Sequence, residues 1–327
     1  EFFTIEPVSL DPYGLVQKIE HIINAEEEKM KYQIKLITPG LNEERRASIF
    51  MGVAGATQVH QISKIIRHFL EQIKRTKNIQ LAMILQMQLP LIERIAKAMY
   101  KGTSVLARGE PIGDSIGPLI VSKMIGDSKT SEIENDTVIA RSKYKGRNVI
   151  LMKAMGPGGR LGRLGRACEK LLKRESVSRI ITIDAAAKLE GEVTGGVAEG
   201  VGVAIGGPGV DKSYIENLAV KRNMPLDSII VKMGQEEAIM AMPSAVKNSY
   251  NEVLKALDRV IERTRKSDKL LIVGVGNTSG IGNSKKEIER AEKLIDASSK
   301  RAEAEKKKRH KERGILKKLL GEEEEEF

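Results

Sequence analysis

Two aspartates stand at positions where a chain of this kind can build a catalytic site. Asp114 lies in a glycine-hinged loop, residues 113–118, that opens directly into an apolar helical segment. Asp184 follows the short apolar run at residues 178–183, which is typical of a buried parallel strand. Ligands of open α/β sheets gather where strands end and helices begin. Two carboxyl groups that meet there share a proton and can act as base and acid toward one water molecule, so these are the candidate catalytic residues.

The same aspartates also have an ordinary structural interpretation. Asp114 can cap the helix that starts near Ile116, and Asp184 can accept hydrogen bonds from neighbouring loop amides. Gly113 and Gly117 suit either interpretation, because glycine lets backbone amides come close to a carbonyl oxygen or an anion. The sequence leaves both interpretations open.

A second candidate site is the glycine- and arginine-rich stretch at residues 156–166, between a predicted strand and a predicted helix. Arginine at a helix N-terminus opposes the helix dipole, and a bound anion would relieve that conflict. The stretch lacks the Gly-Lys-Ser/Thr of a Walker loop and the spacing of a dinucleotide fingerprint. A flexible hinge with salt-bridged arginines is the alternative. The arginines expected on one helix face are Arg160, Arg163 and Arg166, and the candidate ligand-binding residues are Gly158, Gly159, Arg160 and Arg163.

Two further glycine loops, at residues 206–210 and 276–283, follow predicted strands. A lone Gly-x-Gly pattern is weak evidence for a site, and Ser284 as a helix cap explains part of the second loop. The candidate ligand-binding residues of these loops are Gly207, Gly209, Gly276 and Asn277.

No cofactor and no transition-metal site is expected. No histidine occurs between His68 and His310, and the spacing of the earlier histidines does not define a site. Glu236 and Glu237 are the acids best placed to help the two aspartates, which leaves open a hard cation such as magnesium. A turn with solvated acids is the alternative for this pair.

The composition describes a globular protein with a heavily charged surface, at 41% apolar and 30% charged residues. The single cysteine, Cys168, excludes an internal disulfide and suits a reducing cytosol, so a cytoplasmic location is expected. No apolar run reaches the roughly 18 residues that cross a bilayer. The chain begins at Glu1, so membrane attachment through a missing N-terminal segment stays open. Abundant Lys, Glu and Arg with little Cys is typical of heat-adapted proteins.

The net charge of +11 raises the question of a nucleic-acid partner. Aromatic residues make up only 3% of the chain and Trp is absent, which argues against binding single strands by base stacking. Part of the excess charge lies at residues 306–311, ahead of the acidic run at 322–326, and opposed blocks of this kind are typical of a solvated helix end. Nucleic acid and a second copy of the chain both stay open as partners.

The chain is predicted to have three parts: a helical domain at residues 1–108, an α/β domain at 109–284, and a charged helix with an acidic tail at 285–327. Three helices are expected first, and Pro90 should kink or split the third. From Gly109 onward strands and helices alternate, which predicts a three-layer fold around a mostly parallel sheet. The expected first three helices span about residues 13–37, 42–73 and 79–99, and the expected strands span 137–140, 148–153, 179–183, 200–205, 228–232 and 269–275.

The motif at residues 113–119, followed by Ile183-Asp184-Ala185, resembles the two aspartate motifs of the spore germination protease family, which shares the fold of the hydrogenase maturation proteases. The loop at residues 206–210 is similar to the glycine-proline loop after the second aspartate of those proteases. The whole chain resembles an archaeal family, domain of unknown function fifteen-twelve. Some of its members begin with a membrane segment.

One departure from the protease pattern concerns strand order. In those proteases a strand ending in Gly-x-Gly-Asn immediately precedes the first aspartate, whereas here Gly274-Val275-Gly276-Asn277 lies near the C-terminus. A circular permutation would reconcile the two orders, with the last strand inserted into the sheet beside the loop that carries Asp114.

The resemblance implies an aspartate-dependent peptidase or amidase, with an unknown peptide as substrate. Two alternatives stay open. One is a non-catalytic module whose cleft holds a nucleotide, phosphate or nucleic acid, and the other is a scaffold tethered to a membrane.

Overall fold

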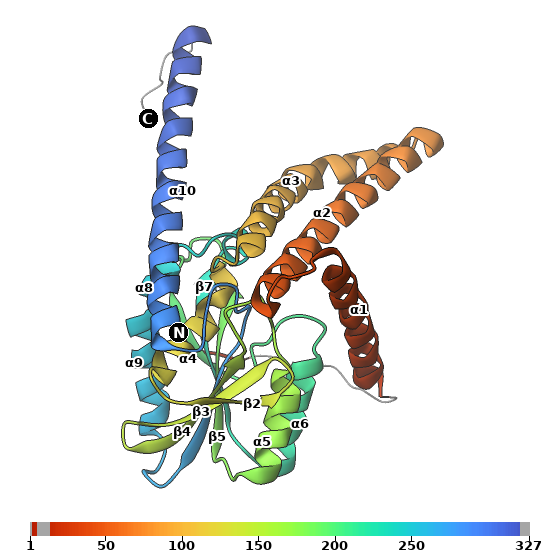
Figure 1. Ribbon diagram of the computed structural model, residues 1–327. Coiled ribbons are helices and arrows are strands. Elements are labelled where there is room, and N and C mark those ends of the chain that lie inside the picture. Colours follow the sequence, from red (N-terminus) through yellow and green to blue (C-terminus); the bar gives the residue numbers. More distant parts are fainter. Residues whose placement is uncertain (1, 5–13, 321–327) are drawn as a thin grey trace.

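The computed structural model describes residues 2–4 and 14–320. Three N-terminal helices stand beside an α/β body built on one eight-stranded sheet, and a long C-terminal helix projects from that body (Figure 1). The predicted start of the first helix at Tyr13 and the acidic run at 322–326 lie outside the described residues.

The three N-terminal helices are α1 (Leu15–Ile37), α2 (Glu43–Thr76) and α3 (Ile79–Arg108). Asn42 and Asn78 cap α2 and α3, because their side-chain oxygens accept the backbone N–H three residues on, at 2.8 and 3.0 Å. The prediction that α3 ends near residue 99 was wrong. The helix runs through Pro90 without a break and ends at Gly109, whose φ of 69° is the usual left-handed helix stop.

The sheet has the strand order β1-β6-β7-β5-β8-β4-β3-β2. Its four central strands, β7, β5, β8 and β4, are parallel, whereas β6 on one side and β3 and β2 on the other add antiparallel pairs. The sheet is therefore mixed, and parallel pairing, which was predicted to dominate, is found in its centre and also in the edge pair of β1 and β6. The strands are β1 (Phe2–Thr4), β2 (Thr130–Glu134), β3 (Thr137–Tyr144), β4 (Arg147–Ala154), β5 (Arg179–Ala187), β6 (Val197–Val201), β7 (Leu226–Met233) and β8 (Lys269–Gly274).

Two strands of the structure differ from the prediction for local reasons. β6 lies three residues earlier than expected, because the glycine-containing stretch after Val201 leaves the sheet as a loop. β2 was not predicted, since it is a polar edge strand whose residues are all partly or fully exposed. It forms a hairpin with β3 through a turn in which Asp136 has a φ of 55°.

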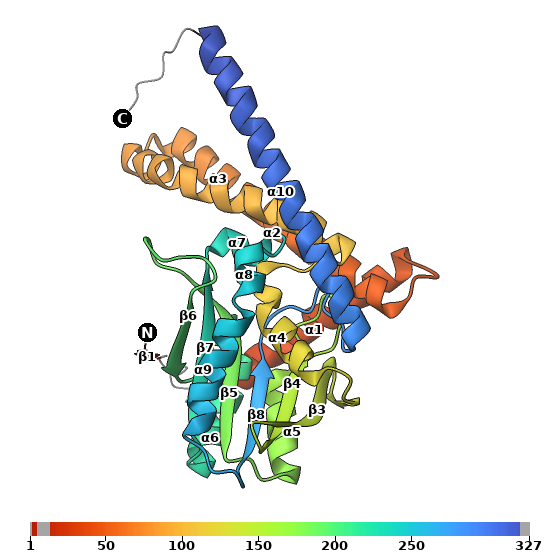
Figure 2. The ribbon, with the colours of Figure 1, turned by 90° about the vertical axis from the view of Figure 1, so that its left-hand side faces the viewer.

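Helices cover both faces of the sheet, as the three-layer prediction requires (Figure 2). One face packs against α4 (Ile116–Ile125), α9 (Tyr250–Glu262) and the start of α10, while α5 (Leu164–Arg174) and α6 (Val210–Arg222) cover the other. Two short helices, α7 (Gln235–Ile239) and α8 (Ser244–Asn248), join β7 to α9.

The last strand, β8, lies in the middle of the sheet between β5 and β4. All of its residues from Leu270 to Gly274 are buried. This confirms the prediction that the terminal strand inserts beside the loop that carries Asp114. That the arrangement is a permuted form of the protease fold stays a prediction.

The predicted charged C-terminal helix is α10 (Lys285–Leu320). Ile288, Ala291 and Ile295 in its first turns are buried against the body, and the remainder extends away from it (Figures 1 and 2). In the part of the chain that the structure describes, no helix has the length and apolarity needed to span a membrane.

Candidate functional site

The candidate site forms where the C-terminal ends of β5 and β8 meet the start of α4. A one-turn 3₁₀ helix, η1 (Gly113–Ser115), carries Asp114 into this position and runs directly into α4. Gly117 lets α4 approach, because a β-carbon there would lie 2.2 Å from the carbonyl oxygen of Val275 and 2.3 Å from that of Ile183. Residues far apart in the chain are therefore brought together by one close backbone contact.

Asp114 is tied to the end of β8. Its Oδ2 accepts a hydrogen bond of 2.8 Å from the backbone N–H of Asn277. Burial raises the pKa of the Asp114 carboxyl, and the Asn277 N–H opposes that rise because it stabilises the ionised form. Gly276 allows this approach, since it has a φ of 126° and its missing side chain leaves room for the Asp114 carbonyl.

Asp184 lies at the end of β5 and is only 4% exposed. Its Oδ1 accepts a hydrogen bond from the backbone N–H of Ala185 at 2.6 Å. Burial raises the pKa of Asp184 well above its usual range, and the negative charge of Asp114 raises it further. The two carboxyl groups are thus close enough to interact electrostatically, and both line the same cleft. The sequence had predicted this meeting.

The cleft has a volume of about 1080 Å³ and lies between the sheet edge and the first two helices. One wall is formed by α1 and α2, and the other by loops that follow β4, β6 and β8. Among the described residues that line it, eight are carboxylic acids and five are lysine or arginine. The wall therefore favours a neutral or cationic ligand over an anionic one.

The arginines of the glycine-rich stretch do not form the predicted anion site. Helix α5 begins only at Leu164, so Arg160 and Arg163 precede it and the three arginines do not share one face of its first turns. Each is paired with an acid from another element, which leaves no dipole conflict for an anion to relieve. The pairs are Arg160 with Asp136 at 2.9 Å, Arg163 with Glu27 at 2.7 Å, and Arg166 with Glu20 at 2.8 Å.

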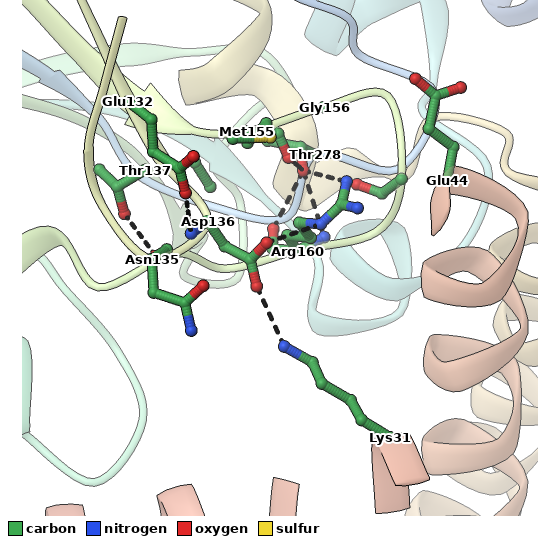
Figure 3. A network of polar contacts seen from close by, with 12 residues as sticks. Lys31, Glu44, Glu132, Asn135, Asp136, Thr137, Met155, Gly156, Arg160 and Thr278 are labelled. Carbon is green, nitrogen blue, oxygen red and sulfur yellow. Dashed lines mark hydrogen bonds and ion pairs between the residues drawn. The ribbon is translucent and has the colours of Figure 1, made fainter. Parts of the chain in front are cut away.

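The pairs of Arg163 with Glu27 and of Arg166 with Glu20 join α1 to the α/β body. Asp136 in the β2–β3 turn pairs with Arg160 and with Lys31 of α1, at 2.9 and 3.0 Å (Figure 3). Thr278 holds the loop that carries Arg160, since its hydroxyl lies 2.9 and 2.8 Å from the carbonyl oxygens of Met155 and Gly158 (Figure 3). The interpretation of salt-bridged arginines, which the sequence had left open, fits these contacts.

The predicted ligand-binding glycines fall into two groups. Gly159, Gly207 and Gly276 line the cleft together with Arg160 and Arg163. The others are not among the lining residues. These are Gly113 beside the Glu237 carbonyl, Gly117 beside β5 and β8, Gly158 beside α2, and Gly209 at the start of α6.

Asn277 contributes more than its backbone. Its Oδ1 accepts a hydrogen bond of 2.8 Å from the Ser279 N–H, which fixes the orientation of the carboxamide. Its Nδ2 is buried and has no hydrogen-bond partner among the described residues. The carboxamide lies directly behind Gly159, where a β-carbon would be 3.4 Å from Oδ1. Asn277 is only 2% exposed and, unlike Gly276, is not among the residues that line the cleft, so the structure does not place it as a predicted ligand-binding residue.

Sequence reasoning missed the acids that α1 and α6 bring to the cleft. Glu20 accepts hydrogen bonds from Arg166 and from the Tyr214 hydroxyl, the latter at 2.7 Å. Asp211 accepts a 2.7 Å hydrogen bond from the Gly165 N–H, and burial raises its pKa. Asp211 follows a glycine loop, which is a usable signal, but nothing local to Glu20 indicates that α1 lies against the sheet edge.

Lys153 is a second residue that sequence reasoning missed. It sits at the end of β4 with no exposed surface, and its Nζ donates to the Ala154 carbonyl at 3.0 Å and to Asn283 Oδ1 at 2.7 Å. Burial lowers the pKa of this amine from its usual 10.5 to about 7. Lys153 does not line the cleft. It connects β4 to the loop after β8, and so supports the loop that holds Asp114.

The acids proposed as helpers for a hard cation are engaged elsewhere. Glu236 pairs with Arg94 of α3 at 2.5 Å, and Glu237 Oε2 accepts hydrogen bonds from the Gly234 N–H and the Thr194 hydroxyl, both at 2.7 Å. Neither lines the cleft with the two aspartates. Within residues 2–4 and 14–320, no group of three or more His, Cys, Asp or Glu side chains is arranged to hold a metal ion.

Two protein-family models match the chain. One, a domain of unknown function (DUF1512) C-terminal, covers residues 112–282, and the other, the DUF1512 N-terminal domain, covers residues 1–109. The chain belongs to the DUF1512 family. No curated protein and no solved structure matches it. The family resemblance seen in the sequence is confirmed, and the resemblance to the two protease families stays a prediction.

Proposed function

We propose that the protein is an aspartate-dependent hydrolase that cleaves a peptide or amide bond. The observation that carries the proposal is the pair of Asp114 and Asp184, whose carboxyl groups line one cleft, interact with each other, and both have raised pKa values. Two carboxyl groups that cannot both ionise easily hold one proton between them, which is the requirement for acting on a single water.

The environments of the two carboxyl groups assign their roles. Asp114 accepts a backbone N–H from Asn277, so it is the group better able to carry the negative charge. Asp184 is deeper and its pKa is raised by the charge of its neighbour, so it keeps the shared proton. Asp114 takes a proton from water as the water oxygen attacks the carbonyl carbon, while Asp184 donates its proton to the carbonyl oxygen. The C–N bond of the tetrahedral intermediate then breaks as the proton on Asp114 passes to the leaving nitrogen, and one hydroxyl of the intermediate returns its proton to Asp184, which leaves a carboxylic acid product and restores the starting protonation states.

The cleft suits a peptide or amide better than a phosphate. Its lining acids outnumber its lining bases, and Arg160 and Arg163 are already paired with Asp136 and Glu27. A phosphate would have to displace those carboxylates. We therefore place the hydrolase ahead of the nucleotide- or nucleic-acid-binding alternatives.

The test is hydrolysis of a peptide library by the purified protein and by Asp114→Asn and Asp184→Asn variants. Each variant should lose about 100-fold or more of any turnover while keeping its circular dichroism spectrum, because one member of the acid–base pair is gone. Glu26→Gln is the matched control, since Glu26 lines the same cleft but is exposed to solvent.

The pH profile gives a second readout. Activity should fall at high pH as Asp184 loses its proton, and at low pH as Asp114 gains one. Because the pKa of Asp184 is raised, the high-pH limb should lie well above the ordinary range of an aspartate. Undiminished turnover in either folded Asn variant would reject the mechanism, and absence of any hydrolysis by the wild type across the library would reject the activity.

A further inference from the structure

Helix α1 forms part of one wall of the cleft, and its side toward the α/β body is polar (Figure 1). Four side chains spaced by four, three and four residues lie along this side, which we call the polar face of α1. They are Glu20, Asn24, Glu27 and Lys31. Three of the four form ion pairs with the body: Glu20 with Arg166 at 2.8 Å, Glu27 with Arg163 at 2.7 Å, and Lys31 with Asp136 at 3.0 Å (Figure 3).

The fourth member of the polar face, Asn24, is not satisfied in the same way. Its Oδ1 is buried and accepts no hydrogen bond from any described residue. Asn24 also lines the cleft. A buried acceptor without a donor costs free energy, and water recovers that cost once it reaches the carboxamide. The position of Asn24 therefore favours separation of the polar face from the body.

Little apolar surface holds α1 in place. Its buried residues are Glu20 and Ile34. The apolar clusters found among residues 2–4 and 14–320 include no residue of α1. The ion pairs are partly exposed as well, since the side chains of Arg166 and Lys31 are 39% and 43% exposed. Pairs of this kind each contribute little and weaken as the salt concentration rises, so α1 belongs to the less stable parts of the molecule.

Ile34, the buried apolar residue of α1, lies close to the connection between α1 and α2. It stands one turn before residues 38–42, which join the two helices. Gly40 in this connection has a φ of 80°, and a β-carbon there would contact nothing within 4 Å. Residues 39–42 are exposed. Rotation about the connection would therefore displace Ile34 little and would separate Glu20 and Glu27, which lie farther along α1, from their arginines.

We propose that α1 is a lid over the candidate site, hinged at residues 38–42 and held closed by its ion pairs with Arg163, Arg166 and Asp136. Asp184 is only 4% exposed, and a peptide has to pass between the two walls of the cleft to reach it. Separation of the ion pairs widens this passage, and their re-formation encloses the bound substrate, as lids do in other enzymes. The role in substrate entry rests on the proposed hydrolase activity, whereas the movement of α1 does not.

The experiment measures how fast a thiol on the polar face reacts with iodoacetamide, which is uncharged. The natural Cys168 has no exposed surface, so the introduced thiol gives the signal. At 0.1 M salt the Asn24→Cys variant should react at least about 10-fold more slowly than Glu28→Cys, which places a thiol at an exposed position of the same helix. At 1 M salt the screening length falls from about 10 Å to about 3 Å, so the reaction of Asn24→Cys should become about 10-fold faster.

The two arginines test the ion pairs directly. Adding Arg163→Gln/Arg166→Gln to Asn24→Cys removes two of the pairs, so labelling at 0.1 M salt should be about 10-fold faster and added salt should have little further effect. The matched control, Lys143→Gln/Lys266→Gln, removes the same charge from exposed residues that do not line the cleft, and should keep the slow rate. Circular dichroism verifies that each variant is folded.

Three results would overturn the lid. The first is a labelling rate that neither salt nor the arginine variant raises, which would make α1 a fixed wall of the cleft. The second is equal labelling of Asn24→Cys and Glu28→Cys at 0.1 M salt, which would mean that α1 has no closed position. The third is equal acceleration by the lysine control, which would attribute the change to net charge instead of to the ion pairs.

Labelling needs no substrate, so its outcome is separate from that of the hydrolase proposal. For any peptide that the protein cleaves, kcat/KM of Arg163→Gln/Arg166→Gln should rise by about the same factor as the labelling rate, because a larger fraction of the molecules is open. An unchanged kcat/KM beside faster labelling would overturn the role in substrate entry and leave the movement of α1 established.

Discussion

The sheet and the arm, which is the hairpin of α2 and α3 at residues 53–97, hold apolar residues of similar kinds but bury them to opposite degrees. In the centre of the sheet, Leu270, Leu271 and Ile272 of β8 have no exposed surface, whereas Met87 in the arm is 76% exposed. The sheet has helices on both faces, and the arm has a partner on only one side of each helix. An apolar pattern therefore predicts that a segment is a helix or a strand. Whether its apolar residues are buried depends on whether another part of the chain packs against them.

The candidate site lies in the tightly packed region. Asp114 and Asp184 are held by backbone contacts between α4, β5 and β8, which leave no spare space. A catalytic pair needs such support, since small displacements of the carboxyl groups would separate them. The base of the arm lines the cleft through Ala54, Thr57, Gln58 and Gln61, so only changes nearer the tip of the hairpin should leave the site unaltered.

The largest expected effect comes from Gly117→Ala. The new β-carbon would lie 2.2 Å from the Val275 carbonyl oxygen, so α4 must move away from the sheet, and the free energy of unfolding should fall by about 3 kcal/mol. Gly206→Ala is the control, because nothing lies within 4 Å of the position its β-carbon would take. Chemical denaturation of both variants measures the difference, and equal stability would show that the contact at Gly117 is not tight.

Lys153→Met should have an intermediate effect, which appears in how the free energy of unfolding depends on pH. Burial lowers the pKa of Lys153 to about 7 in the folded protein, whereas the unfolded chain keeps a value near 10.5. Between these values the unfolded state binds more protons, so the stability of the wild type should rise with pH by up to about 1.4 kcal/mol per pH unit from this group. The contribution is constant below pH 7 and above about 10.5.

The Lys153→Met variant should lack that rise, as denaturation curves at several pH values can show. Lys97→Met serves as the control, because Lys97 is an exposed residue of the arm and its replacement should keep the wild-type slope. If Lys153→Met and Lys97→Met gave the same pH profile, the amine of Lys153 would have to be protonated in the folded state.

The smallest effect is expected in the arm, from Asn78→Ala. The change removes the 3.0 Å hydrogen bond from the Leu81 N–H to Asn78 Oδ1, which caps α3, at a cost of about 1 kcal/mol. Hydrogen exchange should show faster exchange for the first amides of α3 and no change in β8. Faster exchange in both places would mean that the arm and the sheet unfold as one unit.

The elements of the fold could be predicted where the signal is local. The start of the second helix at Asn42 and the strand in the apolar run before Asp184 depend on signals within a few residues, and the structure has both elements. The polar edge strand β2 could not be predicted, because its residues lack the apolar alternation that indicates a strand. The continuation of α3 through Pro90 was also missed, because proline inside a helix was expected to kink or split it.

The candidate site likewise has features that the sequence predicted and features that it could not predict. The sequence placed Asp114 and Asp184 at the ends of elements, and their meeting could be predicted because strand ends share one edge of a parallel sheet. The pairing of Arg160 with Asp136 and of Arg163 with Glu27 could not be predicted, because it depends on how α1 and the β2–β3 turn pack against the glycine-rich loop. For this reason the predicted anion site became a set of internal ion pairs.

By itself the sequence determined the helices of the arm, the strands of the sheet centre, the positions of both aspartates, and the membership of the chain in its family. The tertiary structure decided that β8 inserts between β5 and β4, that α1 closes the cleft, and that the outer face of α3 stays uncovered within one chain. The physical reason is the distance along the chain over which each interaction acts. Capping and periodicity act over one or two turns of the backbone, whereas the partner of a strand, a charge or an apolar face is selected by packing among segments far apart in the chain.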